Sequence, residues 1–219
     1  MTIAGSRQDV AEAALRQSAE IFYASHNWQP FFLEGTKTLA YELWEQSGFQ
    51  APDNLVVPLG YGSNVLGADR GFAELEHTGE IAAGPRLFGV QAARCAPYEA
   101  AFRAGVEHLV PTDVGPTVAE GIATSKPTRV AEVLRAVRRS GGSIVAVEEA
   151  EIVEALRGLA HRGLYVEPTS AVAAAGLTRL IADGSIRPHE RTVLLLTGSG
   201  LKASSITGEL LNLSARPGA

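Results

Sequence analysis

Two glycine-rich segments follow directly after apolar runs, and their position gives them the means to bind a charged ligand. Residues 60–64 (Gly-Tyr-Gly-Ser-Asn) follow the apolar run 54–59, and residues 197–200 (Thr-Gly-Ser-Gly) follow the run 192–196. Glycine has no Cβ, so the backbone can curl and point successive N–H groups inward. A helix that begins at such a loop adds its positive end. The first segment therefore suits a phosphate or a carboxylate group.

The first segment also has simpler interpretations, and they stay open at this point. Ser63 or Asn64 could cap the following helix as well as touch a ligand. The whole loop could instead be a tight turn between a strand and a helix, with no ligand at all. The sequence alone does not choose between these.

Other chemical motifs are missing or broken. A dinucleotide fingerprint needs glycine at position 65, where Val65 stands, and residues 35–38 (Gly-Thr-Lys-Thr) break the order of a nucleotide-hydrolase phosphate loop. The sequence contains no Gly-x-Ser-x-Gly elbow, which argues against a serine hydrolase. Its five histidines are scattered without metal-ligand spacing, so no metal site is predicted.

Elements of alternating type must position the two segments. Short apolar runs predict strands, and apolar residues at helical spacing predict helices. The residues between 106 and 126 lack a clean period and are expected to be mostly loop. The alternation favours an α/β fold with a mostly parallel sheet covered by helices. The predicted strands are 54–59, 86–90, 143–147, 164–166 and 192–196, and the predicted helices are 8–22, 36–46, 64–75, 97–104, 130–140, 148–161 and 168–184.

Composition excludes several classes of protein. Hydrophobic residues make up 46% and charged residues 20%, which is an ordinary globular balance. The net charge of −5 argues against a nucleic-acid or anionic-membrane partner. A single cysteine allows no intrachain disulfide, and we find neither a signal sequence nor an apolar run long enough to cross a bilayer. A cytoplasmic location is expected.

Four segments, in the same order along the chain, resemble threonine synthases. Residues 33–42 are similar to the Glu-Gly-x-Lys-Thr-x-Ala-Tyr-Glu segment of that family, and residues 57–64 resemble its Pro-x-Gly-x-Gly-x-Asn phosphate loop. Residues 166–171 resemble its Glu-Pro-x-Ser-Ala turn, and residues 196–202 its Thr-Gly-x-Gly-Leu-Lys closing motif. One such match would carry little weight, but four in series are specific.

The resemblance implies a pyridoxal-phosphate enzyme of fold type II, built like the large domain of the tryptophan synthase β subunit. Residues 1–28 would be a remnant of the small domain, and residues 29–219 the large domain that binds the cofactor phosphate. The substrate would be an amino acid, O-phosphohomoserine, converted to threonine. Thr197 would offer its hydroxyl group to the pyridine nitrogen, and Glu167 would either stand near the ring or cap its helix. The phosphate would be held, chiefly through backbone N–H groups, by Gly60, Tyr61, Gly62, Ser63 and Asn64.

The sequence departs from the family in two respects. Tyr61 and Ser63 stand where the family usually has Asn and Gly, so a side chain could crowd the phosphate. The family's Schiff-base lysine lies in a segment that would align before Met1, and none of Lys37, Lys126 and Lys202 has its context. Ion pairing is the expected role of Lys37 and Lys202. No catalytic residue is therefore predicted, and we expect an N-terminally truncated enzyme that is inactive alone.

Two alternatives remain beside threonine synthase. The first is another fold-type-II enzyme, such as a threonine or serine ammonia-lyase or a β-replacement enzyme. The second is a non-catalytic relative that binds a phosphate ligand or a protein partner. Loss of earlier strands would leave an apolar sheet edge uncovered. We therefore expect a homo-oligomer, or a need for an N-terminal partner segment.

Overall fold

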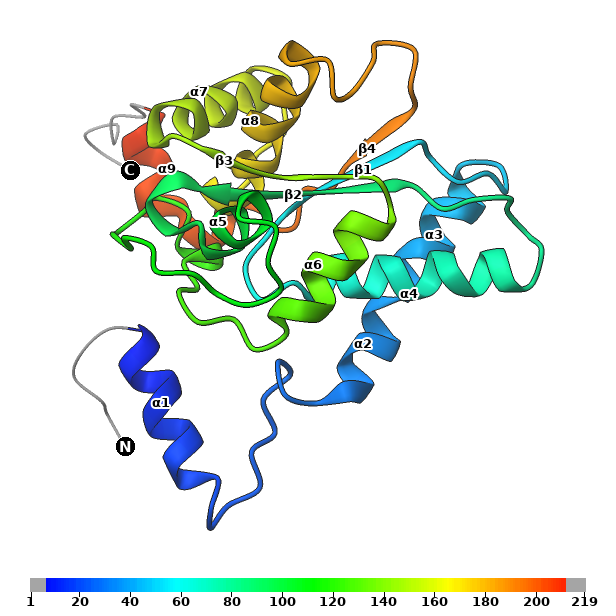
Figure 1. Cartoon of the computed structure of the whole chain (residues 1–219). Coiled ribbons are helices and arrows are strands. Elements are labelled where there is room, and N and C mark those ends of the chain that lie inside the picture. Colours follow the sequence, from blue (N-terminus) through cyan, green and yellow to red (C-terminus); the bar gives the residue numbers. More distant parts are fainter. Residues whose placement is uncertain (1–6, 212–219) are drawn as a thin grey trace.

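The computed structural model describes residues 7–211 and contains a four-stranded sheet (Figure 1). The strands lie in the order β3-β2-β1-β4, and all three pairs are parallel. The predicted class, a mostly parallel sheet covered by helices, is confirmed. The strands are β1 Asn54–Pro58, β2 Arg86–Ala92, β3 Ile144–Val147 and β4 Thr192–Leu194. The helices are α1 Arg7–Gln17, α2 Pro30–Thr36, α3 Thr38–Gln46, α4 Ser63–His77, α5 Pro97–Arg103, α6 Val130–Arg139, α7 Glu149–His161, α8 Pro168–Ala182 and α9 Ser204–Leu210.

Helices cover both faces of the sheet. In Figure 1, α4 and α6 lie on one side of it, and α7 and α8 lie on the other. Leu55 and Val57 of β1 pack with the first pair, and Val56 between them packs with the second. Side chains of a strand alternate between faces, so a strand buried on both faces must be apolar throughout. This explains the continuous apolar run that precedes the first glycine segment.

The helical stripe of α6 shows why periodicity predicted this element well. Val133, Leu134 and Val137 are fully buried, and Val130 packs partly against the same cluster. They recur at the three- and four-residue spacing of one helix face. This face lies against α4 and β2, so it fixes the helix that follows the first glycine loop.

Several predicted boundaries are corrected by the structure. Residues 164–166 do not form a strand, because only Val166 pairs, in an isolated antiparallel bridge with Ser199. The predicted strand 192–196 is shorter, although the Leu195 N–H still donates to the Val56 oxygen at 3.0 Å. The helix predicted over 36–46 is preceded by the separate α2, with Lys37 between the two. The structure also contains α9, a helix that the sequence analysis did not predict for residues 204–210.

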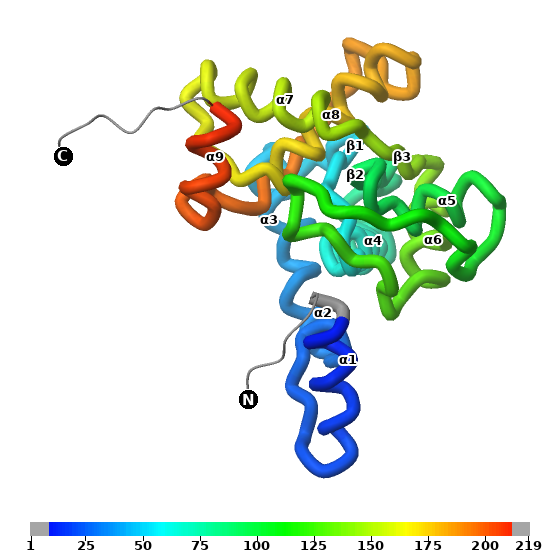
Figure 2. The backbone as a smooth tube through the Cα atoms, turned by 90° about the vertical axis from the view of Figure 1, so that its left-hand side faces the viewer, coloured from blue at the N-terminus to red at the C-terminus, as the bar shows by residue number. Residues whose placement is uncertain are grey.

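The N-terminal region projects away from the sheet, and its apolar side chains are largely uncovered. Figures 1 and 2 show α1 and the segment after it at a distance from α7 and α8. The helix predicted over 8–22 ends at Gln17, and apolar side chains in this region are exposed: Leu15 is 42% exposed, and Phe22, beyond the end of α1, is 79% exposed. Only Ala13 of α1 is buried among the residues whose side chains are described. The boundary predicted at residue 28 stays a prediction.

Candidate functional site

The first glycine loop connects the carboxyl end of β1 to α4. Gly62 has a φ of +91°, and a Cβ there would lie 2.3 Å from Val133 Cγ2. Glycine is therefore required both by the backbone conformation and by the close approach of α6. Gly62 is the N-cap residue of α4 and no side chain caps this helix, so Ser63 and Asn64 do not serve as caps. The first N–H groups of a 15-residue helix are left available to a ligand.

Two buried side chains hold this loop from behind, and the sequence analysis missed both. Gln91 is fully buried, and its Nε2 donates to the Leu59 oxygen at 3.2 Å, while its Oε1 accepts from the Tyr98 N–H at 2.9 Å. The Tyr98 hydroxyl in turn donates to the Tyr61 carbonyl oxygen at 3.2 Å. Burial raises the pKa of Tyr98, so this hydroxyl keeps its proton and remains a donor. The loop is thus fixed before any ligand arrives.

The second loop follows β4 and is held by Ser170 of α8. The Gly198 N–H donates to Ser170 Oγ at 2.8 Å, and Ser170 Oγ lies 3.3 Å from Thr197 Oγ1. The Glu167 N–H donates to the Gly198 oxygen at 3.1 Å. A Cβ on Gly198 would lie 2.0 Å from Glu167 Oε1, so glycine lets the carboxylate lie against the loop. Glu167 is the N-cap residue of α8, but its side chain makes no capping hydrogen bond.

Both loops line one cavity of about 250 Å³. All six residues predicted to bind the cofactor stand in its wall, namely Gly60, Tyr61, Gly62, Ser63, Asn64 and Thr197. The convergence follows from the sheet, because β1 and β4 are adjacent and parallel and their carboxyl ends meet at one edge. Their role as ligands stays a prediction. The sequence analysis assigned no site role to the other lining residues, His26, Asn27, Pro58, Gly121, Ile122, Thr169 and Lys202, apart from the open alternatives for Glu167.

The three lysines differ in their surroundings. Lys37 Nζ lies 2.6 Å from Glu34, and this hydrogen bond is the main cause of a raised pKa for Lys37, which confirms its predicted ion pair. Lys126 pairs with Glu12 at 3.2 Å. Lys202 lines the cavity and forms no ion pair with any carboxylate of residues 7–211, so the pairing predicted for it is wrong within this range.

Comparison with known proteins identifies the group to which the chain is related. Residues 2–198 match the family model described as "Pyridoxal-phosphate dependent enzyme". The chain belongs to this family. The resemblance drawn from the four segments and the predicted cofactor, pyridoxal phosphate, are thereby confirmed.

Within this family, the relatives that we compared with the chain are threonine synthases. It is 37% identical to the threonine synthase of Methanocaldococcus jannaschii over 91% of its own length and 50% of that protein. It is 35% identical to the threonine synthase of Methanosarcina acetivorans over 84% of its length and 46% of that protein. The chain thus spans about half the length of these relatives.

Solved structures support the fold. Threonine deaminase isoform 2 from Solanum lycopersicum superposes with a TM-score of 0.77 at 18% identity, covering 99% of this chain and 60% of that one. A second threonine deaminase, described as from "T.th.", gives a TM-score of 0.68 at 24% identity, covering 91% of this chain and 62% of that one. At these identities the match shows the fold-type-II architecture alone.

The residues of this pyridoxal-phosphate enzyme chain fit the cofactor. The uncapped start of α4 and the glycine backbone of residues 60–62 suit a phosphate group. The Thr197 hydroxyl stands in the same cavity and is held by Ser170, as a polar partner for a ring nitrogen must be. Tyr61 and Ser63, where the sequence departs from the family, are partly buried and stand in the wall of this cavity, and crowding of a phosphate by their side chains stays a prediction.

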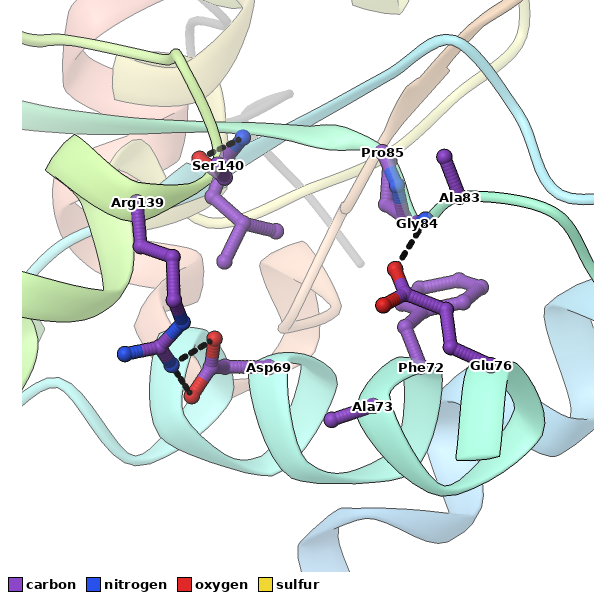
Figure 3. Close-up of a pocket in the computed structure, with 10 residues that line it drawn as sticks. Asp69, Phe72, Ala73, Glu76, Ala83, Gly84, Pro85, Arg139 and Ser140 are labelled. Carbon is purple, nitrogen blue, oxygen red and sulfur yellow. Dashed lines mark hydrogen bonds and ion pairs between the residues drawn. The ribbon is translucent and has the colours of Figure 1, made fainter. Parts of the chain in front are cut away.

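Another cavity of about 250 Å³ lies on a different part of the protein and lacks such free groups. It lies between α4 and residues 83–87 (Figure 3). Arg139 there pairs with Asp69 at 2.6 Å, and the Glu76 carboxylate accepts from the Gly84 N–H. Each charged side chain drawn in Figure 3 thus has a partner among the residues drawn there. We do not assign a ligand to this cavity.

Proposed function

We propose that this chain is the cofactor-phosphate-binding portion of a threonine-synthase-like enzyme that converts O-phosphohomoserine to threonine. The observation that carries the proposal is the convergence of the two glycine loops on one cavity beside an uncapped helix. The likeness to threonine synthases over most of the chain supports the substrate. No helix within residues 7–211 has the length and apolar character needed to cross a membrane. A cytoplasmic location and assembly with a second copy or an N-terminal segment belong to the same proposal.

In this mechanism, the residues of this chain bind the cofactor and orient it. Backbone N–H groups of Gly62, Ser63 and Asn64 hold the phosphate, and the helix dipole of α4 adds to their attraction. The Thr197 hydroxyl, fixed by Ser170, bonds the ring nitrogen and supplies no charge there. When bound, pyridoxal phosphate supplies the electron sink for carbanion chemistry at the amino acid. Gln91 and Tyr98 keep the phosphate loop in its binding conformation.

The catalytic amine is proposed to come from outside these 219 residues. Lys37 and Lys126 are committed to ion pairs, and Lys202 stands in the closing motif rather than in a Schiff-base segment. We expect the chain alone, supplied with pyridoxal phosphate, to release no phosphate from O-phosphohomoserine. Borohydride reduction followed by peptide mass spectrometry checks the reason. A stoichiometric cofactor adduct on Lys202 would show that the chain carries its own amine.

Two threonines at opposite ends of the same segment test the cofactor site. Thr197→Val removes the hydroxyl in the cavity, and Thr192→Val removes one that accepts from Asn54 Nδ2 at 3.0 Å at the other end of β4. We expect Thr197→Val to weaken pyridoxal-phosphate binding about tenfold, because one hydrogen bond contributes roughly 1 to 1.5 kcal/mol to the binding free energy. Thr192→Val should instead lower the free energy of unfolding by about 1 kcal/mol and leave binding unchanged. Equal affinities for both variants, measured by absorbance titration, would contradict the site.

The preferred substrate, O-phosphohomoserine or threonine, distinguishes a threonine synthase from an ammonia-lyase. The solved deaminases resemble the chain in fold, whereas the two synthases described above resemble it in sequence at 35–37% identity. Calorimetric titration of the cofactor-loaded chain with O-phosphohomoserine and with threonine compares the two substrates. Tighter binding of the phosphate ester is expected, and preference for threonine would favour the lyase.

A further inference from the structure

Lys202 brings to the cavity of the two loops an ammonium group that forms no ion pair with a carboxylate of residues 7–211. Lys37 lies 2.6 Å from Glu34, and Lys126 lies 3.2 Å from Glu12. The Lys202 ammonium group has no carboxylate oxygen within 4.0 Å in the part of the chain that the structure describes. An ammonium group carries three hydrogen-bond donors. Those of Lys202 are therefore left for solvent or for a ligand.

Backbone hydrogen bonds hold the turn that carries Lys202, and this residue stands where two cavities meet. Its N–H donates to the Ser199 oxygen at 3.2 Å, and the Gly200 N–H donates to the Tyr165 oxygen at 3.0 Å. The cavity of the two loops and a larger one of about 600 Å³ share a wall. The residues common to both are Gly121, Glu167, Thr169 and Lys202.

Charge decides which cavity suits an anion. Among the residues that the structure describes, Glu167 and Glu209 place two carboxylates in the wall of the larger cavity against the one ammonium group of Lys202. An anion there meets net repulsion. The cavity of the two loops has Glu167 as its one carboxylate, and Lys202 balances it. The uncapped start of α4 then adds a positive field, so the smaller cavity favours the anion.

Glu167 makes a cation necessary there. Its carboxylate lies against Gly198, in the wall that carries Thr197, and it is only partly buried. A phosphate monoester dianion bound in the same cavity would be repelled by this carboxylate. Backbone N–H groups supply partial charges only, whereas an ammonium group supplies a full one.

We propose that Lys202 is an anion-binding residue of this site, whose ammonium group offsets Glu167 and contacts a phosphate monoester dianion in the cavity of the two loops. The proposal rests on the proposed function and adds a charged side chain to its backbone cradle. The phosphate can belong to the cofactor or to the substrate. The two sources share the chemistry that Lys202 recognises, and the experiment separates them.

The test compares Lys202→Met with the matched control Lys126→Met in the full 219-residue chain. Binding of pyridoxal phosphate is measured beside pyridoxal, and binding of O-phosphohomoserine beside homoserine, by isothermal titration calorimetry. We expect Lys202→Met to lose about tenfold in affinity for at least one phosphate ester, the size of one charge-assisted hydrogen bond. Affinity for the partner without phosphate should not change. Lys126→Met should bind all four compounds like the unmodified chain, and Lys202→Arg should retain most of the affinity.

The outcomes distinguish failure of this inference from failure of the function. Loss with pyridoxal phosphate assigns the phosphate to the cofactor, and loss with O-phosphohomoserine alone assigns it to the substrate. If the unmodified chain binds pyridoxal phosphate and Lys202→Met binds both esters equally well, the inference is wrong and the function stands. An equal loss for pyridoxal also overturns it, because charge would then not be the cause. If the unmodified chain binds no pyridoxal phosphate, the proposed function fails with it. Equal thermal unfolding midpoints show that the variants are folded.

Discussion

The two ends of the sheet treat polar groups in opposite ways. At the amino end, Asn54, Arg86 and Thr192 stand at the starts of three adjacent strands and bond one another or Glu190. The Arg86 guanidinium reaches Glu190 at 2.7 Å and Asn54 Oδ1 at 2.9 Å. At the carboxyl end, the start of α4 is uncapped, and Lys202 is without a carboxylate among residues 7–211.

This difference separates stability from binding along the same strands. A buried polar group must find a partner inside the protein, because its desolvation otherwise costs free energy. The amino end meets this requirement with its own side chains, so these polar groups need no ligand. The carboxyl end leaves donors unused at a cavity, where a ligand can satisfy them. Substitutions at the two ends should therefore change different measured quantities.

The largest expected effect is on stability, from Asn54→Leu at the amino end. Asn54 is fully buried and bonds both Arg86 Nε and Thr192 Oγ1. Leucine would leave these groups without one partner each, which should lower the free energy of unfolding by about 2 to 3 kcal/mol. Urea denaturation measures this change. Pyridoxal-phosphate affinity of the folded variant should stay as before, and a parallel loss of affinity would break the separation between the two ends.

The sequence predicted the carboxyl end better than the amino end. The loops at 60–64 and 197–200 could be placed together because each follows an apolar run and parallel strands end at one edge. The pairing of Asn54 with Arg86 depends on strand register, which only the folded sheet sets. For this reason the amino-end network was not foreseen.

The cavity residues that were missed show a second limit of sequence reasoning. Gly121 reaches the site because its N–H donates to Thr169 Oγ1 at 3.1 Å, a tertiary contact between an irregular segment and α8. No periodicity marks such a residue. Lys202 did leave a signal, since it stands in the closing motif two residues after Gly200. The ion pair expected for Lys202 is absent among residues 7–211, because the sequence shows the charge of this residue but not its position in the cavity wall.

Acid should weaken the amino end through Glu190. Hydrogen bonding from the Arg187 N–H, helped by Asn54 and Arg86, lowers the pKa of Glu190 below its usual value of 4.5. A carboxylate with a lowered pKa in the folded state contributes stability above the unfolded pKa and loses it as pH falls through the folded pKa. Glu190→Gln should therefore reduce the loss of stability below about pH 4.5, because it removes this titration. Urea denaturation at pH 7 and at successively lower pH measures the two slopes, and identical slopes would exclude Glu190 as a cause.

The smallest effect on stability is expected at the surface, in the cavity of Figure 3. Arg139 and Asp69 lie 2.6 Å apart, but the arginine side chain is 63% exposed. Solvent screens such a pair, so Arg139→Gln should change the free energy of unfolding by less than about 1 kcal/mol. Pyridoxal-phosphate affinity should also stay unchanged, because the compensated cavity offers a phosphate no free donor comparable to Lys202. Thermal unfolding and a cofactor titration check both expectations. A clear loss of pyridoxal-phosphate affinity in Arg139→Gln would contradict the comparison, because it would show that a paired side chain, and not the unpaired Lys202, binds the anion.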